Sequence, residues 1–370
     1  MTRVLLAPDG FKGSISAAAA AAALAAGWRG ARADDVIVEL PMADGGEGTL
    51  DAFLVAVPGA RRMPVTVTGP HGREVAASWV LLPETPEAPG GTAVVELAST
   101  SGIELLDGDL RPFDADTRGF GEAIAAALDH DVSRLVVAIG SSASTDAGLG
   151  MLVALGARVT DAEGLDVAPG LRGVRAAAGL DRSGLRALPA GGAVVLTDVR
   201  SPLTGPAGAA AVFGPQKGLA PDDIADADTA LARAGALLEI DAAHPGAGAA
   251  GGTGAALLAW GAELVPGAER IADLIGLATA VGEADVVVTG EGSFDASSAT
   301  GKAPARVAAL ARAGGRAVGL VAGRISPDAD TSGFAAAVSL VELAGSTEAA
   351  LAEPARWLAV AGESLARRLG

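Results

Sequence analysis

The chain has 370 residues and a formal net charge of −17, with 27 Lys and Arg against 44 Asp and Glu. Half of the residues are hydrophobic, which excludes intrinsic disorder because enough apolar surface is available to offset the entropy of ordering. The negative charge argues against non-specific nucleic-acid binding, and the absence of cysteine excludes disulfides, thiolate metal sites and a cysteine nucleophile.

The first elements alternate between strand and helix. The unbroken apolar run 4–7 predicts a buried parallel strand. The alanine-rich stretch 16–28 predicts a helix, which Ser14 or Ser16 can cap. A second strand is expected at 36–40, followed by a glycine-rich loop and a helix through 50–55.

The pattern changes in the segment 63–97. Strands are predicted at 65–68, 74–82 and 93–97, and His71-Gly72 is typical of a hairpin turn between the first two. This part of the chain therefore predicts a mixed sheet rather than a parallel one.

Helix and strand alternate again up to the C-terminus. A helix is expected at 119–128 and another ending at 313, with strands at 135–139, 194–197, 284–289 and 317–322. The expected fold class is α/β: a discontinuous parallel-sheet domain formed by 1–62 and 284–370, with a mixed α/β domain, 63–283, inserted into it.

Lysine is rare in this chain and is found beside glycine. Only three of the 27 basic residues are lysines, namely Lys12, Lys217 and Lys302, and each lies in a glycine-containing segment that is expected to be a loop. A compact ammonium next to bare backbone suits an anion site. Chance placement is the alternative in so small a sample.

Carboxylates also follow predicted strands. Asp44 and Glu47 lie among glycines after the second strand, Asp198 follows the strand 194–197, and Glu291 and Asp295 follow the strand 284–289. Open parallel sheets bind ligands beyond the carboxyl ends of their strands. Loop lysines, carboxylates and serine-glycine loops together favour phosphoryl transfer, which needs positioning and charge neutralisation more than covalent chemistry. An ordinary capped turn is the alternative for Asp44 and Glu47.

Other motifs carry less weight. The spacing G-x-G-x-x-G occurs at 246–251 but follows no clear strand, so a closely packed helix start or a loop near a nucleotide is favoured over a nicotinamide site. No Walker phosphate loop is present, and His71, His130 and His244 lack metal-ligand spacing.

In their order along the chain, the motifs resemble the bacterial glycerate kinase family, class I. The matching segments are APDGFKGS at 7–14, LPMADGGEGT at 40–49, GSSASTDAG at 140–148, 197–203, AVFGPQKG at 211–218, 246–254, 290–295 and 301–304.

The resemblance implies transfer of the γ-phosphate of ATP to a hydroxyl of D-glycerate, with Mg2+, to give phosphoglycerate. It implies a flavodoxin-like domain built from both termini and an inserted second α/β domain. The expected partners are glycerate and ATP, with no nucleic acid and no membrane, in the cytoplasm; a homodimer is left open. A kinase of a related hydroxy acid, or a catalytically weak metabolite- or nucleotide-binding homologue, is the alternative.

The resemblance also suggests roles for individual residues. Asp198 is the first candidate for the base and Asp44 the second, while Lys12 neutralises phosphate or the glycerate carboxylate. The remaining expected residues are Asp44 and Glu47 for magnesium, Gly140, Ser141, Ser142, Ser144, Gly290, Glu291 and Lys302 for ATP, and Asp9, Lys217, Asp295 and Arg324 for the substrate. The chain departs from the family pattern at Ser141 and Ala147, where the family usually has glycine.

Overall fold

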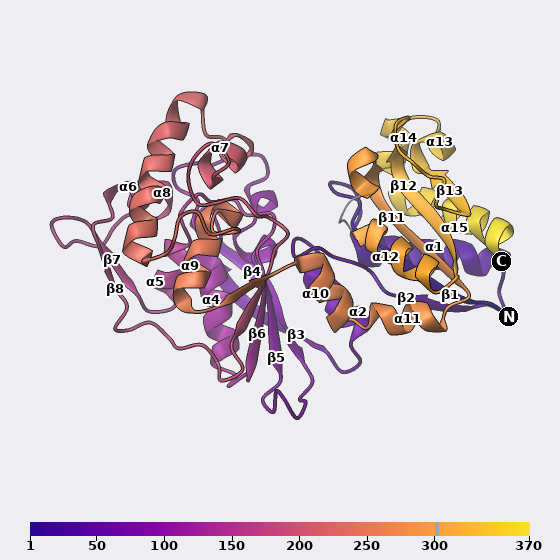
Figure 1. Ribbon diagram of the computed structural model, residues 1–370, viewed down its shortest axis with the longest axis horizontal. Coiled ribbons are helices and arrows are strands. Elements are labelled where there is room, and N and C mark those ends of the chain that lie inside the picture. The colour runs from indigo at the N-terminus through magenta and orange to yellow at the C-terminus, as the bar shows by residue number, and fades with distance from the viewer. Residues whose placement is uncertain (300–302) are drawn as a thin grey trace. The chain divides into compact units, whose positions relative to one another are not determined.

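The computed structural model describes residues 1–299 and 303–370. The chain forms two compact units, which we describe separately (Figure 1). The first contains Met1–Asp44, Asp51–Pro58 and Ala268–Gly370, and the second contains Gly45–Leu50 and Gly59–Gly267. The domain boundaries expected from the sequence, at 62/63 and 283/284, stay a prediction. The segment 268–283 packs within the first unit, because helix α11 (Leu277–Glu283) contacts strand β1 (Arg3–Pro8) and helix α12 (Ala303–Ala313).

The described part of the first unit holds a five-stranded, fully parallel sheet in the order β13-β12-β11-β1-β2. The strands besides β1 are β2 (Val36–Glu39), β11 (Val286–Phe294), β12 (Ala317–Ile325) and β13 (Ala336–Ser339). Numbered within this unit, the order is 2-1-3-4-5, which is that of flavodoxin-like folds. The predicted fold class of the terminal segments is confirmed.

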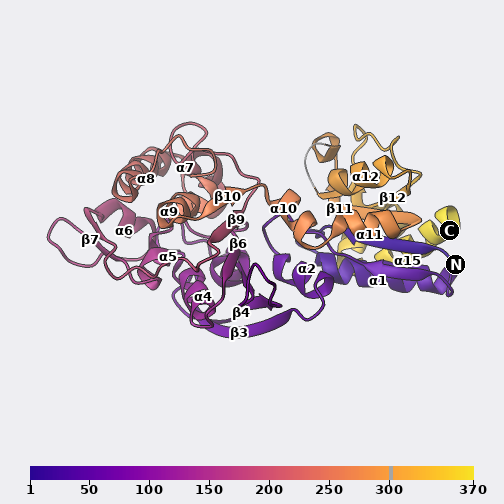
Figure 2. The same ribbon diagram turned by 60° about the horizontal axis from the view of Figure 1, so that its bottom comes forward.

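Helices cover both faces of this sheet. Figure 2 shows α1 and α15 on one face and α11 and α12 on the other. Besides α11 and α12, the helices of this unit are α1 (Ala17–Ala31), α2 (Thr49–Ala56), α10 (Gly267–Leu274), α13 (Leu340–Ala344), α14 (Thr347–Ala352) and α15 (Pro354–Leu369); α2 and α10 begin at residues of the second unit. Ser16, one of the two expected caps, accepts a hydrogen bond from the backbone N–H of Ala19.

Two glycines allow α1 and α15 to pack backbone to backbone. A Cβ on Gly27 would collide with the carbonyl oxygen of Ala359, and one on Gly362 would collide with that of Leu24. Leu24 and Trp28 are fully buried beside this crossing. Both chain termini therefore belong to one core, and they lie side by side in every view (Figures 1 and 2).

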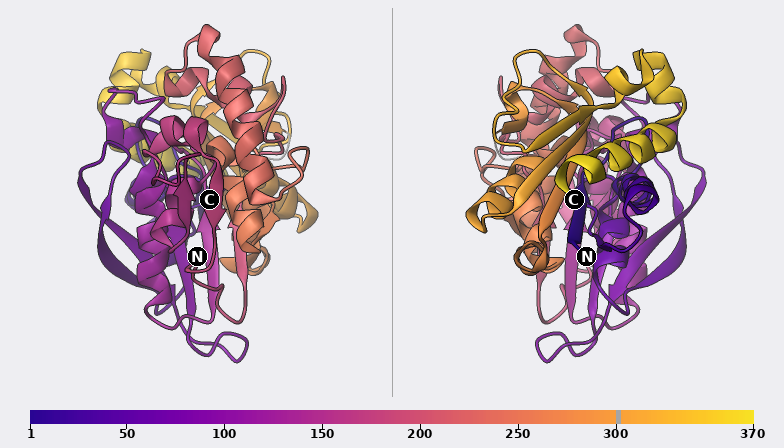
Figure 3. Two further views of the ribbon diagram at one scale, coloured as in Figure 1. Left: turned by 90° about the vertical axis from the view of Figure 1, so that its left-hand side faces the viewer. Right: turned by 90° about the vertical axis from the view of Figure 1, so that its right-hand side faces the viewer.

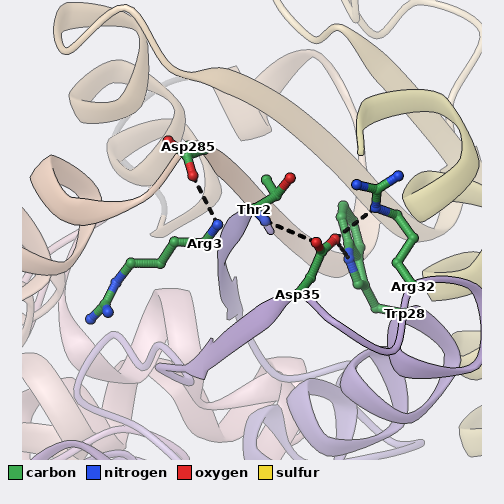
Figure 4. A network of polar contacts seen from close by, with 6 residues as sticks. All are labelled: Thr2, Arg3, Trp28, Arg32, Asp35 and Asp285. Atoms are coloured by element: carbon green, nitrogen blue, oxygen red, sulfur yellow. Dashed lines mark hydrogen bonds and ion pairs between the residues drawn. The ribbon is translucent and has the colours of Figure 1, made fainter.

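A carboxylate ties the end of α1 to the start of the sheet (Figure 4). Asp35 accepts hydrogen bonds from Thr2 N at 2.9 Å, Arg32 Nε at 2.7 Å and Trp28 Nε1 at 3.1 Å. Its side chain is 2% exposed. The bond from Arg32 is the main reason why the pKa of Asp35 falls to about 2, and burial opposes it.

We expect Asp35→Asn to lower the free energy of unfolding at pH 7 by about 1–2 kcal/mol, a figure reduced because solvent screens the partly exposed Arg32. The folded-state pKa lies below the ordinary value of 3.8, so the charged form stabilises the fold above pH 4 and this stabilisation is lost as the pH falls toward 2. Denaturant unfolding from pH 7 to 3 measures the difference, with the exposed neighbour Asp34→Asn as control. A difference that does not shrink in acid would contradict this account.

The second unit has a mixed sheet in the order β10-β9-β6-β5-β4-β3 in its described residues. The first three strands along the chain pair antiparallel and the rest pair parallel. The strands are β3 (Arg61–Thr68), β4 (Glu74–Leu82), β5 (Thr92–Glu96), β6 (Arg134–Ala138), β9 (Ala193–Leu196) and β10 (Glu263–Val265), and a separate hairpin is formed by β7 (Arg158–Thr160) and β8 (Gly179–Asp181). The turn at 71–72 joins β3 and β4 as expected, and Gly72 has a φ of 76°.

The helices of the second unit pack on this sheet and on one another. Helix α4 contacts β3, β4 and β5, while the long helix α8 contacts α6 and α7 (Figure 3, left). The helices are α3 (Ala98–Ser101), α4 (Arg118–Leu128), α5 (Leu149–Ala154), α6 (Gly170–Ala176), α7 (Ala209–Phe213), α8 (Ile224–Leu238) and α9 (Thr253–Trp260). None of the helices in the described part of the chain is long and apolar enough to cross a bilayer.

One expectation about the first unit is wrong. The sequence predicts strands that end at 289 and 322, but β11 continues to Phe294, and its partner β12 continues to Ile325. The glycines that suggested a loop fit the strand because the sheet backbone passes close by: a Cβ on Gly290 would collide with the carbonyl oxygen of Val321. Strand β13 was not predicted.

Candidate active site

The carboxyl ends of β1 and β11 bring together the first group of predicted residues. Asp9 donates its backbone N–H to the carbonyl oxygen of Gly290 at 2.8 Å. A Cβ on Gly292 would lie 3.3 Å from the backbone nitrogen of Lys12, so the loop after β1 runs directly beside β11. Lys12 is exposed and Glu291 is 8% exposed. In a sheet of this order, β1 and β11 are the neighbours where the strand order reverses, which is where ligands bind.

Three more predicted residues lie at this edge of the first unit. Asp44 is exposed at the end of a segment that lies beside β1, since Met42 donates its N–H to the carbonyl oxygen of Pro8 at 2.8 Å. Asp295 follows β11. Arg324 is exposed but lies within β12, opposite Ser293, rather than in a loop after the strand. Lys302 lies outside the described residues.

The carboxyl edge of the second sheet holds another group. Gly140, which follows β6, donates its N–H to the carbonyl oxygen of Gly45 at 2.9 Å, and a Cβ on Gly140 would lie 2.5 Å from the Cα of Gly46. The exposed Glu47 is therefore held near the loop 140–148. The two segments can approach this closely because Gly140 and Gly46 both lack a side chain.

Asp198 lies at the same edge, after β9, and is exposed. Its Oδ1 accepts a hydrogen bond from the N–H of Gly267, the first residue of α10, at 2.9 Å. The carboxylate is therefore oriented by the loop that follows β10.

Lys217 is buried beneath the loop 140–148. Its Nζ donates to Ser142 Oγ at 2.7 Å and to the carbonyl oxygen of Ser144 at 2.5 Å, and the residue is only 2% exposed. Burial lowers the pKa of Lys217 to about 7, and the nearby Asp146 carboxylate acts in the opposite direction. The Lys217 side chain therefore hydrogen-bonds the loop 140–148 from the interior of the second unit instead of facing solvent.

Asp146 is the anchor of the same loop and is 1% exposed. Its Oδ2 accepts from Thr117 N at 2.9 Å, Thr117 Oγ1 at 2.7 Å and Gly150 N at 3.2 Å. Its Oδ1 accepts from Ser144 Oγ at 2.9 Å and Gly148 N at 3.2 Å. The Ser144 hydroxyl therefore donates its hydrogen bond within the loop itself, to Asp146.

Ser141 and Ala147, two of the positions where the chain departs from the family pattern, have left-handed backbone. The φ angle is 59° at Ser141 and 54° at Ala147. This conformation costs a residue with a Cβ more than it costs glycine. The loop keeps its shape because Ala147 donates its N–H to the carbonyl oxygen of Gly251 at 3.0 Å.

The glycine cluster 246–251 packs closely on its neighbours, as the sequence suggests. Gly246 and Gly248 donate their N–H groups to the carbonyl oxygen of Ser201, and a Cβ on Gly248 would collide with the carbonyl oxygen of Pro202. The cluster precedes α9 without following a strand directly, so the dinucleotide-binding context is missing.

The structure thus gathers the predicted residues at two strand edges, one in each unit. The sequence did not single out Thr117 or Asp116 as functional candidates. Both come from the segment before α4, far from the loop 140–148 in the chain, and no local pattern indicates that they meet Asp146. Their burial is decided by the packing of the second unit.

Comparisons with known proteins agree with these motifs. The family model described as the glycerate kinase family matches residues 4–370. Glycerate 2-kinase of Escherichia coli (strain K12) is 39% identical over 334 residues, covering 88% of this chain and 86% of that protein. Glycerate kinase of Bacillus subtilis (strain 168) is 40% identical over 339 residues, covering 89% and 86%.

A solved structure extends the agreement to the fold. The crystal structure of a protein from Salmonella typhimurium LT2 that is described as glycerate kinase 2 has a TM-score of 0.82 and 38% sequence identity, and the match covers 99% of this chain and 97% of that one. The fold, the order of the motifs and these similarities lead to one conclusion: the chain belongs to the glycerate kinase family.

Proposed function

We propose that the chain is an ATP-dependent kinase that transfers the γ-phosphate of ATP to a hydroxyl of D-glycerate. The observation that carries this proposal is the family match over residues 4–370, joined to relatives that are named glycerate kinases. In the reaction the substrate hydroxyl oxygen bonds to the γ-phosphorus, the bond to the ADP oxygen breaks, and the hydroxyl proton passes to a base.

We assign the base to Asp198, with Asp44 as the second candidate. Both carboxylates are exposed at strand ends, and the amide of Gly267 orients Asp198. A carboxylate held in this way accepts a hydroxyl proton as the phosphoryl group arrives. Lys12, exposed beside β11, neutralises phosphate or the glycerate carboxylate. Asp9, Asp295 and Arg324, which come from the same edge of the first unit, are assigned to the substrate.

The loop 140–148 is assigned to ATP phosphates, with Gly140, Ser141 and Ser142 facing the nucleotide. Ser144 and Lys217 are then positioning residues, because the Ser144 hydroxyl bonds Asp146 and the Lys217 ammonium bonds Ser142. Gly290 and Glu291, at the end of β11, remain assigned to ATP.

Magnesium fits the donors that the chain offers. Among the described residues no three His, Asp or Glu side chains gather into a metal cage. Mg2+ with a nucleotide does not need one, since it keeps several waters and binds one or two carboxylates together with phosphate oxygens. Asp44 and Glu47, both exposed, would hold it, and the ion would supply neutralisation of phosphate charge.

A cytoplasmic location is part of the proposal.

Two substitutions test the assignment. We expect Lys12→Ala and Asp198→Asn each to reduce turnover by roughly a hundredfold or more, which corresponds to about 2–4 kcal/mol of lost transition-state stabilisation. A coupled ATP assay against a panel of small hydroxy acids measures the rate, and phosphorus NMR identifies the phosphorylated hydroxyl. The exposed Asp222→Asn serves as control.

Near-normal turnover in both variants would overturn the role assignments. ATP binding by calorimetry without turnover on any acid would identify a catalytically weak homologue instead. Faster turnover of another hydroxy acid than of D-glycerate would shift the proposed substrate within the same class.

A further inference from the structure

The second unit contains a cavity that the proposed function does not use. It has a volume of about 200 Å³ and lies among α5, α6 and β7, which are neighbours in Figures 1 and 2. One part of its lining is apolar, with Leu149, Val153, Val159 and Val174. The other part is charged and includes Asp116, Arg118, Asp146, Arg158 and Asp166.

Asp116 brings a buried carboxyl group to this cavity. The residue is 6% exposed, and its hydrogen bond from the N–H of Arg118 is 3.1 Å long. Burial raises the pKa of Asp116 to about 6, and repulsion by Asp146 adds to this effect. Glu122 also repels it, and the Arg118 guanidinium acts in the opposite direction. The carboxyl group is thus poorly compensated where it stands.

Arg118 brings a cation to the same cavity. In the described part of the chain its guanidinium makes no ion pair within 4.0 Å and no hydrogen bond, although Asp116 is two residues away. Arg158 differs, because Asp166 neutralises it at 2.7 Å and the carbonyl oxygen of Gly164 accepts its second hydrogen bond at 3.1 Å. The Asp116 carboxyl group and the Arg118 guanidinium therefore line the same cavity and attract each other through space, without an ion pair or hydrogen bond between their side chains.

The charges and the size of the cavity indicate the kind of ligand that it can bind. An ammonium group would relieve the repulsion around Asp116, and a carboxylate would match the guanidinium fork of Arg118. The apolar wall accommodates a short hydrocarbon side chain. A cavity of roughly 150 Å³ holds a benzene molecule, so this one admits a compact molecule of about six to ten heavy atoms.

We propose that this cavity is a binding site for a small zwitterionic α-amino acid with a short apolar side chain, whose ammonium lies against Asp116 and whose carboxylate lies against Arg118. None of the cavity's lining residues is individually assigned to ATP, glycerate or magnesium, although Asp146 belongs to the loop 140–148. Thr117 lies between Asp116 and Arg118 in the chain and donates hydrogen bonds to Asp146 through both its N–H and its hydroxyl. The proposed site therefore adjoins the residue that anchors the loop 140–148.

Calorimetry with L-valine on the whole chain tests the proposal. We expect saturable binding of L-valine, and at least tenfold weaker binding of isobutylamine, which lacks the carboxylate, and of 3-methylbutanoate, which lacks the ammonium. Asp116→Asn and Arg118→Gln should each weaken L-valine binding at least tenfold. The exposed ion pair of Asp129 and Arg186 gives matched controls, Asp129→Asn and Arg186→Gln, which should bind as the unchanged chain does.

Each variant is first checked for unchanged thermal unfolding, and L-valine binding is repeated in Lys12→Ala, which leaves the cavity intact. Binding in that variant separates this site from the proposed active site, so the two proposals can fail independently. The proposal would be overturned if L-valine showed no saturable binding, or if isobutylamine or 3-methylbutanoate bound as tightly as L-valine. It would also be overturned if Asp116→Asn and Arg118→Gln left the binding of L-valine unchanged.

Discussion

Replacing Asp146 by alanine is expected to lower the free energy of unfolding of the second unit by about 3–5 kcal/mol. The carboxylate is 1% exposed and accepts five hydrogen bonds, from Thr117, Ser144, Gly148 and Gly150. Alanine leaves the buried N–H and hydroxyl donors without an acceptor, which costs their full desolvation. Asp146→Asn should cost less, because one amide oxygen still accepts.

Denaturant unfolding followed by circular dichroism measures this loss. Asp161→Ala provides the matched control, since Asp161 also accepts backbone hydrogen bonds in a loop of the second unit, from Glu163 and Leu165, but is near the surface. We expect that control to cost about 1 kcal/mol. If Asp146→Ala costs no more than the control, the carboxylate does not anchor the loop.

Replacing Lys217 by methionine is expected to reduce turnover by roughly a hundredfold while the fold is retained. Methionine fills a similar volume but removes the donor that joins Ser142 Oγ to the carbonyl oxygen of Ser144. The loop 140–148 then loses its support from below, and the groups assigned to ATP phosphates lose their positions. Lys217→Arg should not restore turnover, because the larger planar head does not fit a fully buried site.

The stability of the protein in alkali tests the burial of Lys217 independently of catalysis. The folded state releases the Lys217 proton near pH 7, whereas the unfolded state holds it to about 10.5. The unfolded state therefore binds more protons between these values, and the free energy of unfolding should rise by roughly 3 kcal/mol from pH 7 to 10. The chain has no tyrosine or cysteine to titrate in this range.

In Lys217→Met this alkaline rise should disappear, while in Lys12→Met it should remain because Lys12 is exposed. Denaturant unfolding at pH 7, 8, 9 and 10 compares the two variants with the unchanged chain. Equal slopes in all three proteins would mean that Lys217 is not buried as a neutral amine. Full turnover in Lys217→Met would remove its positioning role.

Local sequence patterns determined much of the fold. The apolar run 4–7, the alanine-rich stretch 16–28 and the strands at 65–68 and 74–82 form where expected, because periodicity and turn chemistry act over a few residues. The interruption of the parallel pattern at 63–97 also indicated the mixed second sheet. The same patterns failed at 290–294, since glycine weakens a strand locally and only the close approach of β12 explains it there.

The candidate site, too, was predicted from the sequence only in part. The sequence pointed to Lys12, Asp198 and the loop 140–148 because lysines and acids follow predicted strands among glycines. It could not indicate that Lys217 is buried against Ser142, or that Thr117 and Asp146 bond each other, because these residues come from separate segments and their pairing depends on which faces pack together. Burial, and with it the shifted pKa values of Lys217 and Asp116, exists only once the second unit has excluded water from both groups.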